Sequence, residues 1–354
     1  MKAHYTSNKI LIDWLSFTIS NIDIEVLIDL FGFGDMQFAE LKGNRGYASK
    51  YFCDGVNINY GKTSDDMADF WVELSGQGCR VFESYGHGDW IYLLSNLLDN
   101  DTINITRLDV AYDDFNGLIN LDDIVADVLS QHFVSKSRSK RYKCGSFCVE
   151  LSSEGTCVTI GKCKSNMMVR IYDKAAERNA EAEFEHWVRC EEQLRYQNAM
   201  QFCKLLCKHQ VVMPGGDFVG ISVEGLNIDK LYFGVLNNYL RFIDVSANAD
   251  TNLWRKPMAE HWKRFAHSVT DERFSLWVKP GVTYNVLRLD RVVEHQFSGA
   301  VVTYTLIHGI DKLVSVLIDR IPYLNTKYKY LLRDHYKNNN DVIFPELVGG
   351  SNAN

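Results

Sequence analysis

The sequence has 354 residues, of which 46% are hydrophobic and 23% are charged, and its formal net charge is −7. These values are typical of a globular protein with one large domain or two smaller ones, and the negative charge argues against a simple polyanion-binding protein. No run of about 18 apolar residues occurs, so we expect no membrane span.

The nine cysteines are an odd number, and the polar segment from Met1 to Lys9 lacks the apolar core of a secretion signal. We therefore expect reduced thiols and a cytoplasmic protein. No Cys-x-x-Cys pair is present, which argues against structural zinc.

The N-terminal part predicts strands and short helices. The first strand, Ile10–Ser20, contains Asp13, an unusual charge in an apolar strand because a buried carboxylate needs a partner. A glycine pair in Ser75–Arg80 follows a strand and precedes a helical segment, Val81–Tyr85, which is typical either of a phosphate-binding turn or of a plain tight turn. The other predicted elements are helices at Asp23–Phe31 and Asp89–Leu98 and strands at Tyr47–Tyr51, Val56–Tyr60 and Phe70–Leu74.

A second informative strand is predicted at Asn104–Asp114. Its alternation places Arg107, Asp109 and Asp113 on one face. Carboxylate oxygens suit Mg²⁺ or Mn²⁺, so this face predicts a metal site. A structural ion pair between the arginine and an aspartate explains the pattern equally well.

A basic stretch follows the predicted helix Leu121–Ser130. Between positions 136 and 174 there are nine basic and three acidic residues. The stretch is carried by a predicted hairpin, Arg141–Leu151 with Thr156–Gly161, and it is either a solvated face or a surface that binds DNA phosphates. The candidate DNA-binding residues are Lys136, Arg138, Lys140, Arg141, Lys143, Lys162 and Lys164. The spacing around Gly161 and the cysteine at 163 exclude a nucleotide-binding P-loop.

The strand predicted at Val169–Lys174 places Arg170, Tyr172 and Lys174 on one face. A phenol with a pKa near ~10 is a poor nucleophile at neutral pH, but flanking cations favour the phenolate and hold a phosphate nearby. The simpler interpretation is a half-buried strand tyrosine with charged neighbours. The next strand, Trp187–Arg195, again places a carboxylate, Glu191, between arginines on one face.

The remainder of the chain predicts mostly helices, and we place a domain boundary at Val212–Asp217. The predicted fold is α+β, with a β-sheet and helices followed by a mostly helical C-terminal region. No internal repeat is evident. The predicted helices are Gln201–His209, Lys256–His267, Val282–Gln296, Val301–Ile321 and Lys327–Tyr336.

Six short motifs, in order over residues 9 to 270, resemble the Rep_trans initiators of rolling-circle plasmids and filamentous phages. The motifs are Ile12-Asp-Trp-Leu-Ser-Phe-Thr18, Ser75-Gly-Gln-Gly-Cys-Arg80, Arg107-Leu-Asp-Val-Ala-Tyr-Asp-Asp114, Ile160-Gly-Lys-Cys-Lys-Ser165, Arg170-Ile-Tyr-Asp-Lys174 and Arg189-Cys-Glu-Glu-Gln-Leu-Arg195. The resemblance implies an antiparallel catalytic sheet and an enzyme that nicks one DNA strand at an origin. Such an enzyme keeps a 5′-phosphotyrosine link, leaves a 3′-OH and later rejoins the strand.

The resemblance also implies the roles of individual residues. Tyr172 would be the nucleophile, and Arg170 and Lys174 would neutralise the phosphate. Asp109, Glu191 and, with less support, Asp113 would hold Mg²⁺ or Mn²⁺. Asp13 and Asp114 are weaker members of this set.

The resemblance implies partners and a division of the chain as well. The partners are origin DNA, single-stranded or as a hairpin nick site, a host helicase, and a second copy of the chain, because Tyr172 alone fits the motif and termination needs a second transfer. Tyr112, Tyr142 and Tyr196 are weaker in-chain candidates for that transfer. We expect a nicking and strand-transfer domain at 1–212, a helical region at 213–347 that binds DNA or dimerises, and a flexible tail at 348–354.

Three other functions compete with this hypothesis. A conjugative relaxase performs the same chemistry on a transfer origin. A non-catalytic origin-binding protein would retain the fold without the reaction. An unrelated α+β protein would carry the same residues as structural ion pairs, but the joint presence of Tyr172, Asp109 and Glu191 favours an active enzyme.

Overall fold

The structure is a computed structural model that describes residues 7–65, 67–152, 155–207, 227–247, 250–276 and 297–324, with single positions at 289, 293, 328 and 332. The predicted boundary at Val212–Asp217 and the predicted tail at 348–354 lie outside the described residues. The predicted helices Val282–Gln296 and Lys327–Tyr336 do so too, apart from the single positions.

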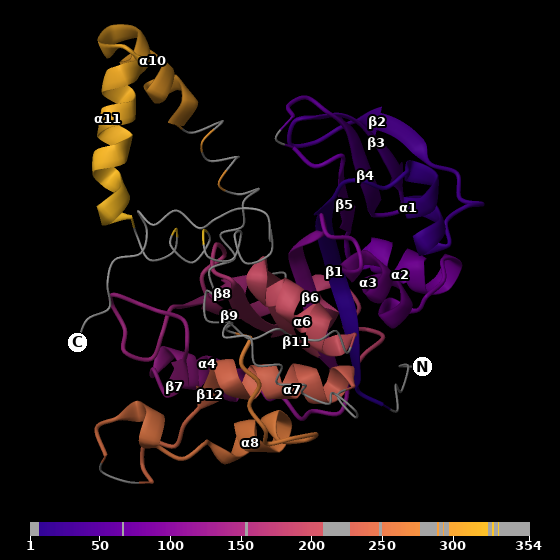
Figure 1. Ribbon diagram of the computed structural model, residues 1–354. Coiled ribbons are helices and arrows are strands. Elements are labelled where there is room, and N and C mark those ends of the chain that lie inside the picture. Colours follow the sequence, from indigo (N-terminus) through magenta and orange to yellow (C-terminus); the bar gives the residue numbers. More distant parts are fainter. Residues whose placement is uncertain are drawn as a thin grey trace. The chain divides into compact units, whose positions relative to one another are not determined.

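An antiparallel sheet of ten strands forms the centre of the fold (Figure 1). Its strands lie in the order β2-β3-β4-β5-β1-β6-β11-β10-β9-β8. This confirms the predicted α+β class with an antiparallel sheet. The strands are β1 Lys9–Ile19, β2 Ala39–Lys42, β3 Tyr47–Cys53, β4 Val56–Lys62, β5 Phe70–Leu74, β6 Asn104–Asp114, β8 Phe147–Ser152, β9 Gly155–Gly161, β10 Met167–Asp173 and β11 Val188–Arg195. A separate pair joins β7 Phe133–Ser135 to β12 Leu240–Phe242.

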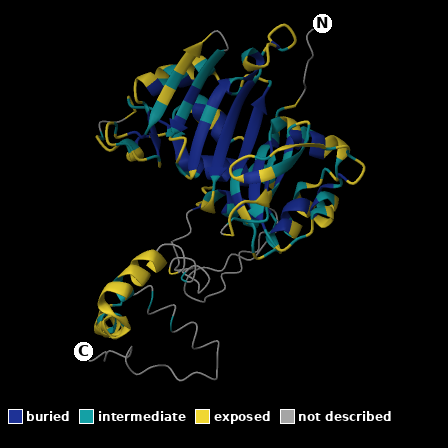
Figure 2. Ribbon diagram, turned by 90° about the horizontal axis from the view of Figure 1, so that it is seen from above, coloured by how far each residue is buried: buried dark blue, intermediate teal, exposed yellow. Residues whose placement is uncertain are grey.

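The strands alternate apolar and polar side chains and direct the apolar ones, such as Leu108 and Val110, into the core. The helices contribute the rest of this apolar core. The helices are α1 Ile24–Phe31, α2 Gly76–Tyr85, α3 Trp90–Leu98, α4 Leu121–Leu129, α5 Lys174–Glu177, α6 Gln197–Leu206, α7 Ile228–Tyr239 and α8 Glu260–Ala266, with a 3₁₀ turn at η1 Leu253–Arg255. Asp89 and Asn120 cap α3 and α4 by accepting hydrogen bonds from first-turn N–H groups. Figure 2 shows that the central strands are the most buried part of the sheet and of the helices that pack on it.

The sheet contains a repeat that the sequence does not reveal. The elements β1-α1-β2-β3-β4-β5-α2 recur in the same order as β6-α4-β8-β9-β10-β11-α6, with β7 and α5 inserted. The two halves are arranged outward from the central β1–β6 pair, and α2 contacts β1 as α6 contacts β6. The fold therefore has approximate two-fold symmetry about this pair.

Two elements start later than predicted. The strand expected from Arg141 begins at Phe147, because the Ser139 hydroxyl accepts hydrogen bonds from the N–H groups of residues 141 and 142 and holds that segment in a turn. The helix expected from Lys256 begins at Glu260, because Pro257 favours an extended backbone at the residue before it. By contrast, α6 begins four residues before the predicted Gln201.

The chain divides into two compact units, one of residues 1–211 and 218–278 and the other of 212–217 and 279–354. The first unit therefore continues beyond the boundary that we expected near 212, since α7 contacts α6, β12 and α8. In the second unit, the single helix expected at Val301–Ile321 is two helices, α10 Ser298–His308 and α11 Ile310–Arg320, followed by a 3₁₀ turn at η3 Ile321–Tyr323. Gly309, with a φ of 83°, separates them.

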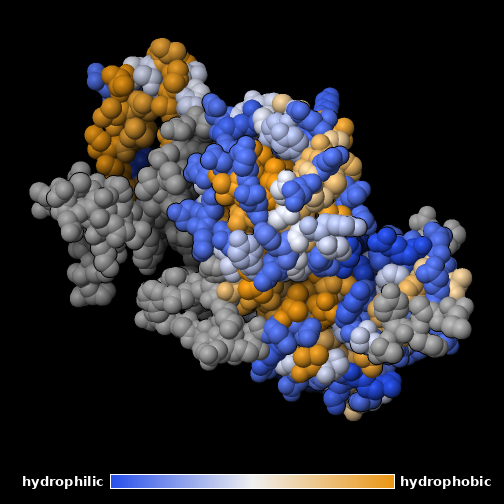
Figure 3. Space-filling model, turned by 90° about the vertical axis from the view of Figure 1, so that its right-hand side faces the viewer, coloured by the Kyte–Doolittle hydropathy of each residue, from blue (hydrophilic) through white to orange (hydrophobic). Residues whose placement is uncertain are grey.

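The helices α10 and α11 expose several large apolar side chains, including Leu306, Ile307 and Leu317 (Figure 3). Within the part of the chain that the structure describes, no helix is both long and apolar enough to cross a membrane.

One side chain contradicts the alternation of the core strands. Glu192 lies on the apolar side of β11, opposite Val110 and Val169, and is fully buried. Neither of its carboxylate oxygens has a hydrogen-bond partner among the described residues. Burial raises the pKa of Glu192 well above its ordinary value, so the folded protein holds this group as a neutral acid.

We expect Glu192→Gln to remove a pH dependence from the stability. The unfolded chain releases this proton near pH ~4.3 while the folded chain retains it to a much higher pH. The contribution of Glu192 to the free energy of unfolding is therefore fully present below pH ~4.3 and falls by about 1.4 kcal/mol per pH unit until the folded-state pKa is reached. Urea unfolding between pH 4 and 8 should show that the free energy of unfolding of the variant increases relative to that of the wild type as the pH rises. The exposed Glu25→Gln is the control, and equal slopes for the two variants would contradict the assignment.

Candidate active site

The polar face of the sheet carries a continuous set of charged side chains across β6, β11 and β10. In the register of these strands Asp109 lies opposite Gln193, and Glu191 lies opposite Arg170. Asp109, Glu191 and Gln193 are each at most 4% exposed. Buried charges require partners, so the ion pairs on this face determine its geometry.

The Tyr172 hydroxyl lies at the centre of this set. It donates a hydrogen bond to Glu191 Oε2 at 3.2 Å, and Lys174 Nζ donates to it at 3.5 Å. Arg170 Nη2 donates to the other Glu191 oxygen at 2.5 Å, and its guanidinium lies 5.6 Å from the centre of the Tyr172 ring. The structure therefore brings together Arg170, Tyr172 and Lys174, which alternation placed on one face, and adds Glu191 of the neighbouring strand.

The protonation of Tyr172 differs from the expectation. The flanking cations were expected to favour the phenolate. Instead, burial and the charge of Glu191 raise the pKa of Tyr172 far above its ordinary value, and Arg189 and Arg170 offset this only in part. Tyr172 is therefore a neutral phenol at physiological pH, with its proton directed at a carboxylate.

The two central carboxylates affect each other. Burial, with a contribution from the charge of Glu191, raises the pKa of Asp109 to about 7 although Arg107 opposes the shift. Burial would also raise the pKa of Glu191, but Arg170, Arg189 and Arg107 outweigh it and lower that pKa. Glu191 is thus ionised at neutral pH, while Asp109 lies near the midpoint of its titration.

The third acid that was predicted to bind a metal, Asp113, is paired with Arg189. Both oxygens of Asp113 accept hydrogen bonds from Arg189, at 2.7 and 2.8 Å, and Arg189 Nη1 donates to Asp13 Oδ2 at 2.6 Å. Among the described residues, no group of three or more His, Cys, Asp or Glu side chains could hold a metal ion. The predicted set of Asp109, Glu191 and Asp113 is therefore not assembled, because each acid is paired with an arginine of its own, Arg107, Arg170 and Arg189 respectively.

Asp114 is also held away from the set. It is fully buried, and its oxygens accept hydrogen bonds from the N–H groups of residues 116 and 119 and from His186. Burial raises the pKa of Asp114, but the bonds from His186 and the backbone outweigh it and lower the pKa. Asp114 therefore stabilises the loop after β6.

The unusual charge at Asp13 is explained by an irregularity in β1. The register with β6 shifts between Ile12 and Trp14. Such a bulge changes which side chains face the polar side. Asp13 reaches Arg189, and the Arg107 guanidinium lies 4.1 Å from the centre of the Trp14 ring. Neither Trp14 nor Arg189 was predicted to belong to the site. Both lie within motifs that carry the family resemblance, and Arg189 also shares the alternation of Glu191.

The turn at Ser75 is the start of α2. The Ser75 hydroxyl accepts a hydrogen bond from Gly78 N, and a Cβ on Gly78 would lie 2.4 Å from the Gly55 carbonyl oxygen. Close packing accounts for this glycine, which supports the simpler of the two interpretations of the motif.

The seven candidate DNA-binding residues are all exposed. Lys136, Arg138 and Lys162 line a common pocket at the start of β10. Lys140, Arg141, Lys143 and Lys164 are not among the residues that line it. Since Tyr172 is five residues further along β10, roughly 17 Å of strand separates it from the start of β10.

Comparisons with known proteins match nearly the whole first unit. Residues 103–314 match the family of replication initiation factors, Rep_trans, and residues 9–95 match the N-terminal domain of rolling-circle replication initiation proteins. The two matches meet between α3 and β6, where the repeat of the sheet begins.

Two relatives are each 25% identical to this chain in sequence. A Bacillus subtilis (strain 168) protein named as a DNA relaxase, NicK, is 25% identical over 283 residues, which cover 76% of this chain and 73% of the relative. The solved structure of a rolling-circle replication initiator protein from Geobacillus stearothermophilus is 25% identical, with a TM-score of 0.63 over 76% of this chain and 99% of that one.

We expect Arg189→Met to destabilise the protein by about 3–5 kcal/mol, because it leaves two carboxylates without their shared cation. Lys62→Met removes one partner of the exposed Lys62–Asp69 pair and should leave the free energy of unfolding nearly unchanged. Urea unfolding at pH 7 measures both. A cost for Arg189→Met no larger than that of the control would show that the buried pair does not support the fold.

Proposed function

Because the chain belongs to the replication initiation factor family, we propose that it nicks one strand of origin DNA and so starts rolling-circle replication. The observation that carries the proposal is the Tyr172 hydroxyl, hydrogen-bonded to Glu191 and flanked by Arg170 and Lys174. This arrangement supplies a nucleophile, a proton acceptor and two cations for a phosphate within one side-chain layer.

The proposed reaction begins when a DNA phosphodiester reaches the Tyr172 hydroxyl. The tyrosine oxygen forms a bond to phosphorus while its proton passes to Glu191, which already accepts its hydrogen bond. The bond from phosphorus to the 3′ oxygen breaks, and that oxygen takes a proton from water. The products are a 5′-phosphotyrosine link and a free 3′-OH, and reversal of the same steps rejoins the strand.

The raised pKa of Tyr172 makes this proton transfer necessary, since little phenolate exists before the reaction. Arg170 and Lys174 place positive charge beside the phosphate as its oxygens gain charge. The pKa of Lys174 is lowered by burial and by Arg189, yet its contact with Glu177 keeps a carboxylate partner close.

A divalent ion fits only part of the predicted ligand set. Asp109 and Glu191 present oxygen donors and repel each other in a buried site, although Arg107 and Arg170 already offset part of this repulsion, and a cation would relieve the rest. Mg²⁺ is commonly held by one or two carboxylates together with substrate phosphates, so these two residues would hold it and Asp113 would not. A bound Mg²⁺ or Mn²⁺ would polarise the scissile phosphate.

The proposal extends to partners. Origin DNA is the substrate, a host helicase unwinds it, and the reaction takes place in the cytoplasm of a bacterial host. We include a homodimer, because Tyr172 has no second tyrosine beside it among its described contacts. Tyr112 accepts a hydrogen bond from Asn8, and its ring packs in the core against Phe233 and Phe265. The apolar surfaces of α10 and α11 suit a protein partner better than DNA.

The similarity to a protein named as a DNA relaxase favours one second candidate, a relaxase that performs the same reaction at a transfer origin. The two functions share the nucleophile and differ in the DNA that is recognised.

Tyr172→Phe should abolish formation of a covalent protein–DNA adduct, because the nucleophilic oxygen is removed while the ring remains. The measurement uses supercoiled DNA that carries the cognate origin, with Mg²⁺, followed by gel electrophoresis in SDS. Tyr112→Phe, which also removes a tyrosine hydroxyl, should still form the adduct. An adduct with Tyr172→Phe would show that another residue attacks the DNA.

Asp109→Asn should weaken binding of Mn²⁺ by about tenfold or more, whereas Asp113→Asn should leave it nearly unchanged. Calorimetric titration of the folded proteins with Mn²⁺ measures both, and circular dichroism checks that Asp113→Asn remains folded. Equal losses in the two variants would place Asp113 in the metal site and contradict the geometry described above.

A further inference from the structure

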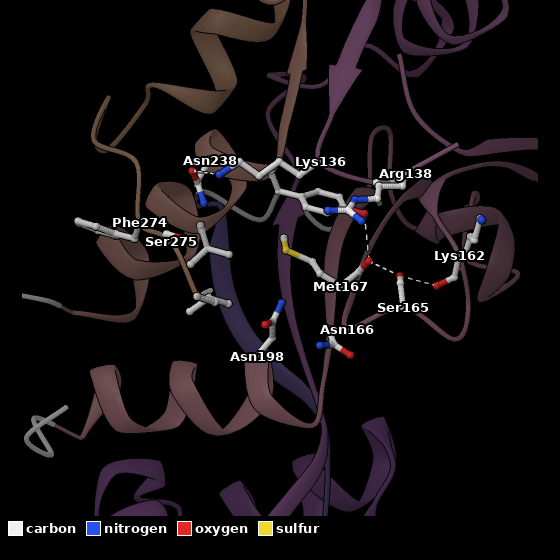
Figure 4. A pocket seen from close by; sticks show the side chains of 14 residues that line it. Lys136, Arg138, Lys162, Ser165, Asn166, Met167, Asn198, Asn238, Phe274 and Ser275 are labelled. Atoms are coloured by element: carbon white, nitrogen blue, oxygen red, sulfur yellow. Dashed lines mark hydrogen bonds between the residues drawn. The ribbon is translucent and has the colours of Figure 1, made fainter. Parts of the chain in front are cut away.

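A pocket of about 490 Å³ lies at the start of β10, away from Tyr172 (Figure 4). Figure 4 shows Lys136 and Arg138 on one side, Lys162 beside the β9–β10 turn, Phe274 opposite and Asn198 below. Its size falls within the range of pockets that hold small ligands.

The lining is positively charged and has no counter-charge. Of the 14 described residues that line the pocket, three are cationic and none is acidic. Arg273 lies close enough to contribute to lowering the pKa of Lys136, after burial, and it affects Arg241 in the same way. Crowded cations without acids are typical of a site for an anion.

The rest of the lining suits the other parts of a nucleotide. Met167, Tyr239 and Phe274 offer apolar and aromatic surface, and Asn198 and Asn238 offer amide groups. Asn198 lies in the first turn of α6, a ten-residue helix that starts without a side-chain cap. The positive end of that helix therefore adds to the field in the pocket.

The pocket is held in shape by its own contacts. The Met167 carbonyl oxygen accepts hydrogen bonds from Ser165 Oγ at 2.6 Å and from Tyr239 Oη at 3.0 Å. Gly161 has a φ of 117°, and a Cβ there would lie 2.7 Å from Tyr239 Oη. The glycine that superficially resembled part of a P-loop is thus required by the turn that places Lys162 at the pocket.

We propose that this pocket binds one nucleotide of the DNA strand that flanks the nick site, with the phosphate on Lys136, Arg138 and Lys162 and the base against Tyr239 and Phe274. The inference rests on the proposed function and adds a second attachment point for the same strand. Met167 lies five residues before Tyr172 on β10 and its side chain faces the other side of the sheet, so the DNA strand passes the start of β10 between the pocket and the nucleophile.

The test compares two double variants in the Tyr172→Phe protein, so that binding is measured without cleavage. The pocket variant is Arg138→Gln with Lys162→Gln. The matched control is Lys263→Gln with Arg264→Gln, which removes the same charge from exposed residues of α8, outside both the pocket and the basic stretch. The probe is fluorescein-labelled single-stranded dT20 at 0.15 M salt, followed by fluorescence anisotropy, and thymidine monophosphate is titrated separately.

We expect the pocket variant to bind dT20 at least about tenfold more weakly than the parent, because two charge-assisted contacts are lost, and the control variant to change by less than about threefold. Equal affinities for the two variants would overturn the inference and leave the proposed function intact. Thymidine monophosphate binding that depends on Arg138 and Lys162, without a matching effect on dT20, would assign the pocket to a free nucleotide and also overturn it. Failure of every protein to bind dT20 would overturn both the inference and the proposed function.

Discussion

The geometry of the polar face depends on one buried cation. The guanidinium of Arg189 binds Asp113 on the neighbouring strand and Asp13 two strands away, so a single side chain joins β11, β6 and β1. On its other side, Tyr172 of β10 lies directly opposite Arg189 in the register. Because these groups are already desolvated and paired, Tyr172, the proposed nucleophile, is held in place before any DNA arrives, which would lower the reorganisation that the proposed reaction requires.

Local alternation was sufficient to predict which residues share a face, because side chains of a strand alternate with a period of two. It therefore predicted that Tyr172 lies between two cations and Glu191 between two arginines, whereas the antiparallel sheet and a shared site for Tyr172 and Glu191 were implied by the family resemblance. It could not predict the protonation of Tyr172, since that depends on burial by distant parts of the chain. The contact between Asp13 and Arg189 joins residues 176 positions apart through a bulge, and no local pattern contains such information.

The approximate symmetry of the sheet shows where the chemistry has been placed. The symmetry about the central β1–β6 pair relates each position in one half of the sheet to a position in the other. Following the paired residues outward from this pair, the position of Glu191 in the second half corresponds to that of Trp71 in the first half. By the same count, Gly61 stands where Tyr172 stands. The two halves share an architecture, but only one of them carries a nucleophile, a carboxylate and their cations.

This inequality has a consequence for direction. A surface with true two-fold symmetry would accept a DNA strand equally well in either orientation, because turning the strand around would present the same contacts. A DNA strand has a 5′ and a 3′ end, and the reaction must distinguish the two sides of one phosphodiester. By keeping reactive groups on one half alone, the fold acquires a polarity that its backbone lacks, and the sheet can then tell the two ends of a strand apart.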